Sequence, residues 1–62
     1  MSNNSAIMVK LKDGRLGLVP SKQPKGLPVG KVSVEICDTA WFRTGEKILS
    51  TLKEAEQIGF ID

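Results

Sequence analysis

Alternating apolar and polar side chains near the start of the chain predict a β-hairpin. Residues 6–12 and 15–19 both show the two-residue period of a half-buried strand. Asp13 and Gly14 lie between them and form a preferred pair for a two-residue type I′ turn. A two-residue loop places Leu11 opposite Leu16 and Val9 opposite Leu18, so that every apolar pair falls on one face and every basic residue on the other. The sequence therefore predicts two antiparallel strands with one apolar and one basic face.

The next segment, residues 20–30, has the composition of a long basic loop. Three prolines and two glycines exclude a regular helix or a central strand there. Residues 31–37 alternate again, with Val32, Val34 and Ile36 on one face, and predict a third strand. Residues 40–43 fit either a short fourth strand or the approach to a helix.

The C-terminal part of the chain has the spacing of an amphipathic helix over residues 45–58. Ile48, Leu52 and Ala55 recur at intervals of four and three residues. Thr44 suits the N-cap, and Gly59 lies where a left-handed C-terminal cap is expected. The expected fold class is α+β: a small antiparallel sheet of three to four strands that starts with a β-hairpin and packs against one C-terminal α-helix.

Chain length limits the core that this domain can build. Residues 1–5 are small and polar and predict a disordered N-terminal tail, which leaves residues 6–62 as a single small domain. So short a domain buries only a thin core. One cysteine cannot form an internal disulfide, so we expect self-association to supplement the core, with a dimer favoured.

The composition argues against an enzyme. The chain has no histidine, so neither a Ser-His-Asp nor a Cys-His site can form within it, and a Cys/His zinc site is excluded. Only Glu35 and Asp38 are expected to approach each other as a carboxylate pair. A domain this small does not readily provide the desolvated cleft that such a pair needs. We therefore expect no catalytic residues, no metal site and no cofactor.

The sequence also predicts a cytoplasmic protein without membrane contact. Its start lacks the basic and apolar regions of a signal peptide. No apolar stretch approaches the roughly 18 residues of a membrane-spanning helix. The lone Cys37 suits a reducing compartment.

Positive charge is concentrated in one part of the chain. Residues 10–31 carry six basic side chains and one acidic side chain, a net charge of +5, whereas the whole chain carries +2. A basic hairpin face and loop can lie along a phosphate backbone. The leading expectation is a nucleic-acid-binding or regulatory module that contacts DNA or RNA through Lys10, Lys12, Arg15, Lys22, Lys25, Lys31 and Arg43. The alternative is that these lysines only protect a strand edge from aggregation.

Two adjacent aromatic residues, Trp41 and Phe42, form a second candidate surface. An exposed aromatic side chain can anchor a protein contact. The alternative function is therefore a protein-interaction module, such as a small inhibitor, an adaptor or a self-associating subunit. Such a module would use a strand edge or the region of Trp41 and Phe42. This hypothesis predicts a contiguous apolar patch beside Trp41.

Residues 14–36, about a third of the chain, resemble the DNA-binding domain of AbrB-like transition-state regulators. A glycine-arginine strand that ends in Pro20, a leucine-containing segment and a Val-Glu-Ile strand follow one another as in that family. The chain departs from the family where Pro24 and Gly26 interrupt its short helix and where the arginines of that helix are missing. The resemblance implies DNA binding.

Overall fold

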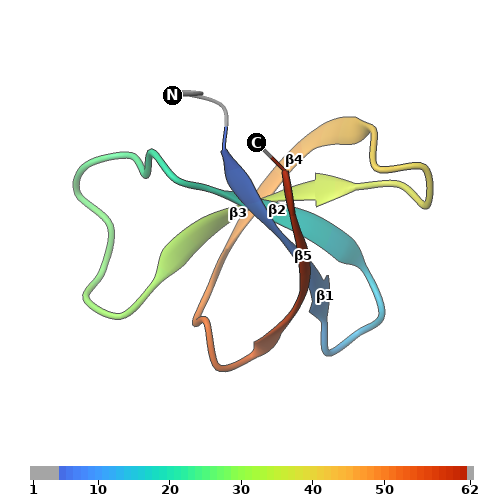
Figure 1. Ribbon diagram of the computed structural model, residues 1–62. Helices are drawn as coiled ribbons and strands as arrows, with labels where there is room; N and C mark the ends of the chain where they lie inside the picture. Colours follow the sequence, from blue (N-terminus) through green and yellow to red (C-terminus); the bar gives the residue numbers. More distant parts are fainter. Residues whose placement is uncertain (1–4, 62) are drawn as a thin grey trace.

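The computed structural model describes residues 5–61 and consists of one antiparallel sheet (Figure 1). Its five strands lie in the order β4-β3-β2-β1-β5, and the described part contains no helix. The strands are β1 (Ala6–Leu11), β2 (Leu16–Pro20), β3 (Val32–Cys37), β4 (Arg43–Ser50) and β5 (Ala55–Ile61). The expected α+β class is therefore wrong. Of the expected disordered tail, residues 1–4 lie outside the described part, and the carbonyl of Ser5 accepts a hydrogen bond from Ser21 N–H at 2.9 Å.

The expected helix over 45–58 is replaced by β4, a tight turn and β5. Thr44 does accept the N–H of Glu46 at 3.3 Å, but its own hydroxyl donates to the carbonyl of Ile36 at 3.2 Å and fastens β4 to β3. Gly45 has a φ of +92°, which is incompatible with a helix. A helix of this length is marginal on its own, so pairing with the sheet overrides the local spacing.

The hairpin forms, but its register differs by one residue from the expected one. The N–H of Leu11 donates to the carbonyl of Arg15 at 2.8 Å, and Gly14 N–H donates to the carbonyl of Leu11 at 3.0 Å. The loop therefore has three residues, and Gly14, with a φ of +91°, occupies its left-handed position. Lys10 consequently pairs with Leu16, and Val9 with Gly17.

This shift gives the sheet two apolar faces, because side chains alternate along a strand. The inner face carries a core with contributions from β1, β2, β3 and β5: Val9, Leu11, Val19, Val34, Ile36 and Ala55. Ile48 of β4 packs against it. The outer face carries a second, smaller cluster with Ala6, Leu18 and Cys37 at its centre.

The sheet covers its own inner face by curling. β1 pairs with both β2 and β5, while β4 and β5 are the two edge strands. Figure 1 shows the strands crossing one another at steep angles around a common centre. A curled sheet can bury one apolar face without a helix. The α+β expectation failed on this point, since it assumed that a second layer was needed.

Candidate functional site

The basic residues expected to bind nucleic acid do not gather on one surface. Lys10, Lys12 and Arg15 lie in or beside the β1–β2 turn. Three others, Lys22, Lys25 and Lys31, lie in the loop between β2 and β3, which is residues 21–31. Figure 1 shows this loop (green) and the β1–β2 turn (blue to cyan) projecting on opposite sides of the sheet.

Both arginines of the expected site are engaged in ion pairs. Arg15 Nε lies 2.6 Å from Asp13 Oδ2, and Arg15 Nη1 lies 3.5 Å from Glu46 Oε2 on β4. Arg15 also donates its backbone N–H to Asp13 Oδ1 at 3.0 Å. These contacts hold the pKa of the Asp13 carboxyl below its ordinary value, the backbone hydrogen bond more than the guanidinium.

Arg43 is paired in the same way on the other side of the sheet. Its Nε lies 2.8 Å from Glu35 Oε2 on the neighbouring strand β3. That oxygen is buried and accepts no aligned hydrogen bond from the described residues, so charge attraction to Arg43 is its main compensation. Arg15 and Arg43 thus each have a carboxylate partner in the described part of the chain.

The three loop lysines are exposed, and none forms an ion pair within residues 5–61. Gln23 fixes the base of their loop. Its Nε2 donates to the carbonyl of Pro20 at 2.9 Å and to that of Ser33 at 3.3 Å, and its Oε1 accepts the N–H of Ser33 at 2.7 Å. The loop is thus anchored to the ends of β2 and β3, with its cations facing solvent.

A five-residue turn between β3 and β4 positions Trp41. Asp38 Oδ1 accepts the N–H groups of Ala40 at 2.9 Å and Phe42 at 3.0 Å. Trp41 has a φ of 66°, a left-handed conformation that is costly for a bulky side chain, and its N–H donates to the carbonyl of Asp38 at 3.0 Å. The strain is offset by packing, because Trp41 covers the outer cluster. Phe42, by contrast, is 70% exposed.

The outer cluster and the side chains around it form what we call the Trp41 face. Met8, Leu16, Ile61 and Trp41 are each only half-buried and surround the buried centre of the cluster. The alternative hypothesis predicted an apolar patch beside Trp41, and this face has that composition. Trp41 is neither fully exposed nor wholly buried.

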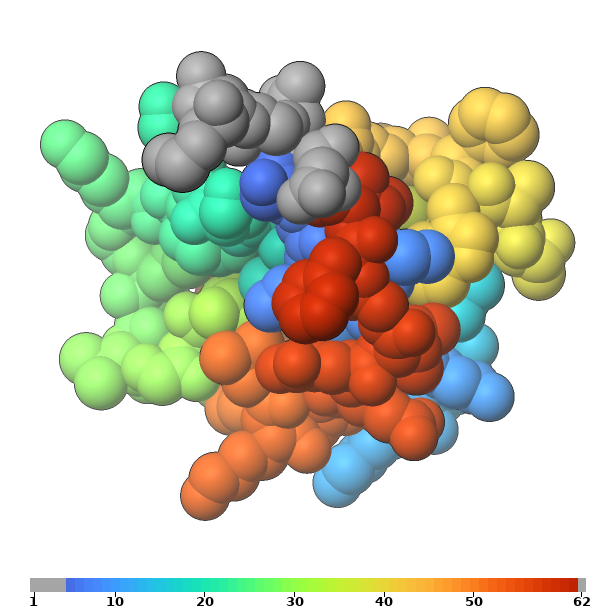
Figure 2. Space-filling model, viewed as in Figure 1, coloured from blue at the N-terminus to red at the C-terminus, as the bar shows by residue number. Residues whose placement is uncertain are grey.

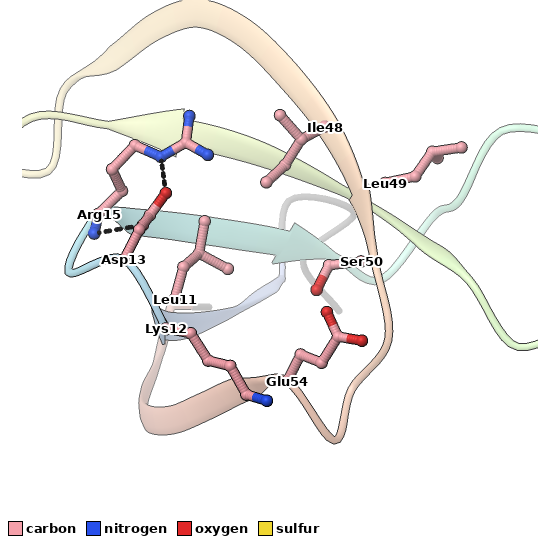
Figure 3. Close-up of a pocket in the computed structure, with 8 residues that line it drawn as sticks. All are labelled: Leu11, Lys12, Asp13, Arg15, Ile48, Leu49, Ser50 and Glu54. Atoms are coloured by element: carbon pink, nitrogen blue, oxygen red, sulfur yellow. Dashed lines mark hydrogen bonds and ion pairs between the residues drawn. The ribbon is translucent and has the colours of Figure 1, made fainter.

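A polar cleft of about 200 Å³ lies between β4 and the β1–β2 turn (Figure 3). Leu11 and Ile48 line it together with Arg15, whose charge is already matched by Asp13. The Ser50 hydroxyl donates to the carbonyl of Thr51 at 3.1 Å. The Arg15 charge at the cleft is thus already paired. The Ser50 hydroxyl is already hydrogen-bonded, so it is not a free nucleophile.

The described residues outside these surfaces offer little metal-binding or nucleophilic chemistry. Residues 5–61 contain no cluster of three or more acidic or cysteine side chains that could hold a metal ion. Cys37 is buried, and its Sγ donates to the carbonyl of Glu35 at 3.7 Å. Burial raises the pKa of the Cys37 thiol, which disfavours the reactive thiolate.

The apolar outer face was not predicted, although the sequence contains a signal for it. Residues 6–9 read Ala-Ile-Met-Val, an uninterrupted apolar run, and such a run marks a strand that is covered on both faces. Sequence reasoning counted Met8 with the polar side because lysines follow it at Lys10 and Lys12.

No family model, curated protein or solved structure matches the chain. The likeness to AbrB-like regulators therefore rests on residues 14–36 alone. Within residues 5–61, no helix is present that is long and apolar enough to cross a membrane.

Proposed function

We propose that this protein is a non-enzymatic protein-interaction module that self-associates through the Trp41 face. The observation that carries the proposal is the half-buried apolar surface of Met8, Leu16, Ile61 and Trp41 on the outside of a curled sheet. When one face of an antiparallel sheet meets water, each strand normally places polar residues on that face and apolar residues on the other. A contiguous apolar patch on a small protein marks a contact surface.

The charges at the edge of this face favour a second copy of the chain as the partner. Lys10 lies opposite Glu56 on the neighbouring strand, and Glu35 lies opposite Lys47. Each of these cross-strand pairs joins an acidic and a basic side chain. Two copies related by a two-fold axis can bring such mixed charges together without repulsion.

A second argument comes from size. The 62 residues contain one cysteine, so they form no internal disulfide, and so short a chain buries only a thin core. Burial of the Trp41 face in a dimer would add apolar area at about 25 cal/mol per Å². Self-association supplies the stabilisation that other small domains take from a disulfide or a metal ion.

Sedimentation velocity over a wide concentration range tests this proposal. We expect the wild-type mass to rise toward that of a dimer with increasing concentration. Met8→Glu and Leu16→Glu each place a charge on the Trp41 face and should shift the equilibrium to monomer. Ile58→Glu is the matched control, since Ile58 is 51% exposed and lies outside the cluster. A wild-type protein that stays monomeric at every concentration rules the proposal out.

The loop lysines support a second candidate, which is nucleic-acid binding through residues 21–31. Lys22, Lys25 and Lys31 are exposed and have no carboxylate partner in the described part. Binding to mixed-sequence DNA or RNA should then weaken steeply with salt. Replacement of these three lysines by Gln should abolish binding, whereas Lys10→Gln with Lys12→Gln should have little effect. Binding independent of salt contradicts this candidate.

A further inference from the structure

An apolar groove lies at the end of the sheet where β5 passes the ends of β1, β2 and β3. We call it the β5 groove; it has a volume of about 320 Å³, and its apolar lining includes Ile7, Val19, Val32, Leu52, Phe60 and Ile61. Among the described residues, no side chain that lines it carries a charge. In Figure 2 the red surface of β5 faces the viewer on this side of the molecule.

Phe60 lies at the rim of this groove and does not fill it. Phe60 is opposite Ile7 across the β1–β5 pair, yet it is 78% exposed. Val19, which lines the groove, is only 5% exposed and belongs to the inner core, and Ile7 packs on that core. An exposed aromatic ring therefore lies beside a hollow whose lining is fixed by core packing.

The β5 groove is continuous with the Trp41 face. Ala6 and Ile61 both line the groove, and both also belong to the outer cluster. They lie opposite each other across the β1–β5 pair, at the corner where the chain enters and leaves the sheet. One apolar surface therefore runs from the Trp41 face around this corner into the groove. A partner that covers Ala6 and Ile61 on the Trp41 face also meets the groove.

We propose that the β5 groove receives Phe60 of a second copy of this chain, in a reciprocal contact about a two-fold axis. A contact of this symmetry joins the same patch on both copies, so a protruding side chain on the patch must meet a hollow on it. Phe60 and the β5 groove provide this pair on one chain. An aromatic side chain that fills a pocket is a common anchor of a protein interface.

The charge of the chain agrees with a contact at this place. Each chain carries a net charge of +2, and an uncharged surface is where two such chains repel each other least. The contact presupposes the self-association proposed above, for which Phe60 would be the anchor.

Photo-cross-linking of the full chain tests the contact directly. Phe60→p-benzoylphenylalanine places a photoreactive ring at the groove rim, and mass spectrometry of the cross-linked dimer locates its adducts. We expect adducts at groove residues of the second copy, such as Ile7 and Val32. Phe42→p-benzoylphenylalanine is the matched control, since Phe42 is 70% exposed and does not line the groove. Equal dimer yield from position 42, or adducts from position 60 only outside the groove, overturns the proposal.

Two variants remove the protruding ring and the hollow separately. Phe60→Ala should raise the dimer dissociation constant at least about tenfold in sedimentation velocity, whereas Phe42→Ala should leave it unchanged. Ser21→Trp fills the groove from an exposed position and should weaken the dimer in the same way. Because Phe60 is exposed, Phe60→Ala should unfold at nearly the wild-type urea concentration, which separates a lost contact from a lost fold.

The outcomes distinguish this contact from the Trp41 face itself. If Met8→Glu gives monomers while Phe60→Ala and Ser21→Trp dimerise like the wild type, the Trp41 face stands and the groove contact is wrong. If Phe60→Ala gives monomers and Met8→Glu does not, the groove contact stands and the Trp41 face is not the interface. A wild-type chain that is monomeric at every concentration overturns both.

Discussion

Gly17 lies directly against Val34 on the inner face of the sheet. A Cβ at position 17 would lie 2.5 Å from Val34 Cγ1 and 3.3 Å from the carbonyl oxygen of Glu35. We expect Gly17→Ala to lower the free energy of unfolding by about 1–3 kcal/mol, because a fully buried Val34 cannot move aside. Urea denaturation measures the change. Gly59→Ala is the control, since its Cβ would meet only the flexible Met8 side chain at 3.2 Å, and an equal loss there would contradict the explanation.

Asp38 holds the turn that places Trp41 on the outer face. Asp38→Ala removes the acceptor for the N–H groups of Ala40 and Phe42, and should lower the free energy of unfolding by about 1–2 kcal/mol. Trp41 is the only tryptophan, so its fluorescence reports the turn directly, and its emission should shift to longer wavelength as it becomes solvated. Asp38→Asn retains an acceptor oxygen and should resemble the wild type. Unchanged emission in Asp38→Ala would show that packing alone places Trp41.

Gln23 links the loop of residues 21–31 to the sheet. Gln23→Ala leaves the N–H of Ser33 without its partner in a residue that is only 8% exposed. The expected loss is about 1–3 kcal/mol in thermal or urea unfolding. Gln57→Ala, at an exposed position of β5, is the comparison and should change stability by less than about 0.5 kcal/mol. If the two variants are equally stable, the loop is not held by Gln23.

The buried thiol of Cys37 predicts a loss of stability at alkaline pH. Its pKa is raised in the folded protein, so the unfolded chain releases this proton first as pH rises past about 8.5. The stability that the protonated Cys37 thiol contributes is fully present below that pH. It is lost as the pH rises toward the pKa of the thiol in the folded protein. Denaturation of the wild type between neutral and mildly alkaline pH should therefore show a decline that Cys37→Ala lacks. Parallel pH profiles for the two proteins would exclude the thiol as the cause.

Three strands could be predicted from the sequence because the two-residue alternation of their side chains depends only on neighbouring residues. The ranges expected for those strands overlap β1, β2 and β3. The hairpin register was wrong because Asp13-Gly14 suits both a two-residue turn and the last two positions of a three-residue loop. The choice between these two loops depends on Gly17, because only a residue without a Cβ fits against Val34 at that position. That contact joins residues far apart in the sequence.

The helix over 45–58 failed for a related reason. Ile48 and Ala55 have helical spacing, yet Ile48 packs beside Val34 on β3 and Ala55 beside Leu11 on β1. Neither partner can be inferred from a local pattern. The candidate site was likewise limited, since counting charges along the sequence grouped Lys12 with Lys25. Lys12 lies in the β1–β2 turn and Lys25 in the loop between β2 and β3. Figure 1 shows these two segments on opposite sides of the sheet.

Ala6 and Ile61 lie opposite each other across the β1–β5 pair, so the chain enters and leaves the sheet at one corner (Figure 1). A short linker could join these ends, and new ends opened in the loop at Lys25 would leave every strand pair intact. The same arrangement lets the unit be inserted into a surface loop of a host protein with little distortion on either side. Because Ala6 and Ile61 also belong to the outer cluster, any chain joined at this corner would lie next to the Trp41 face.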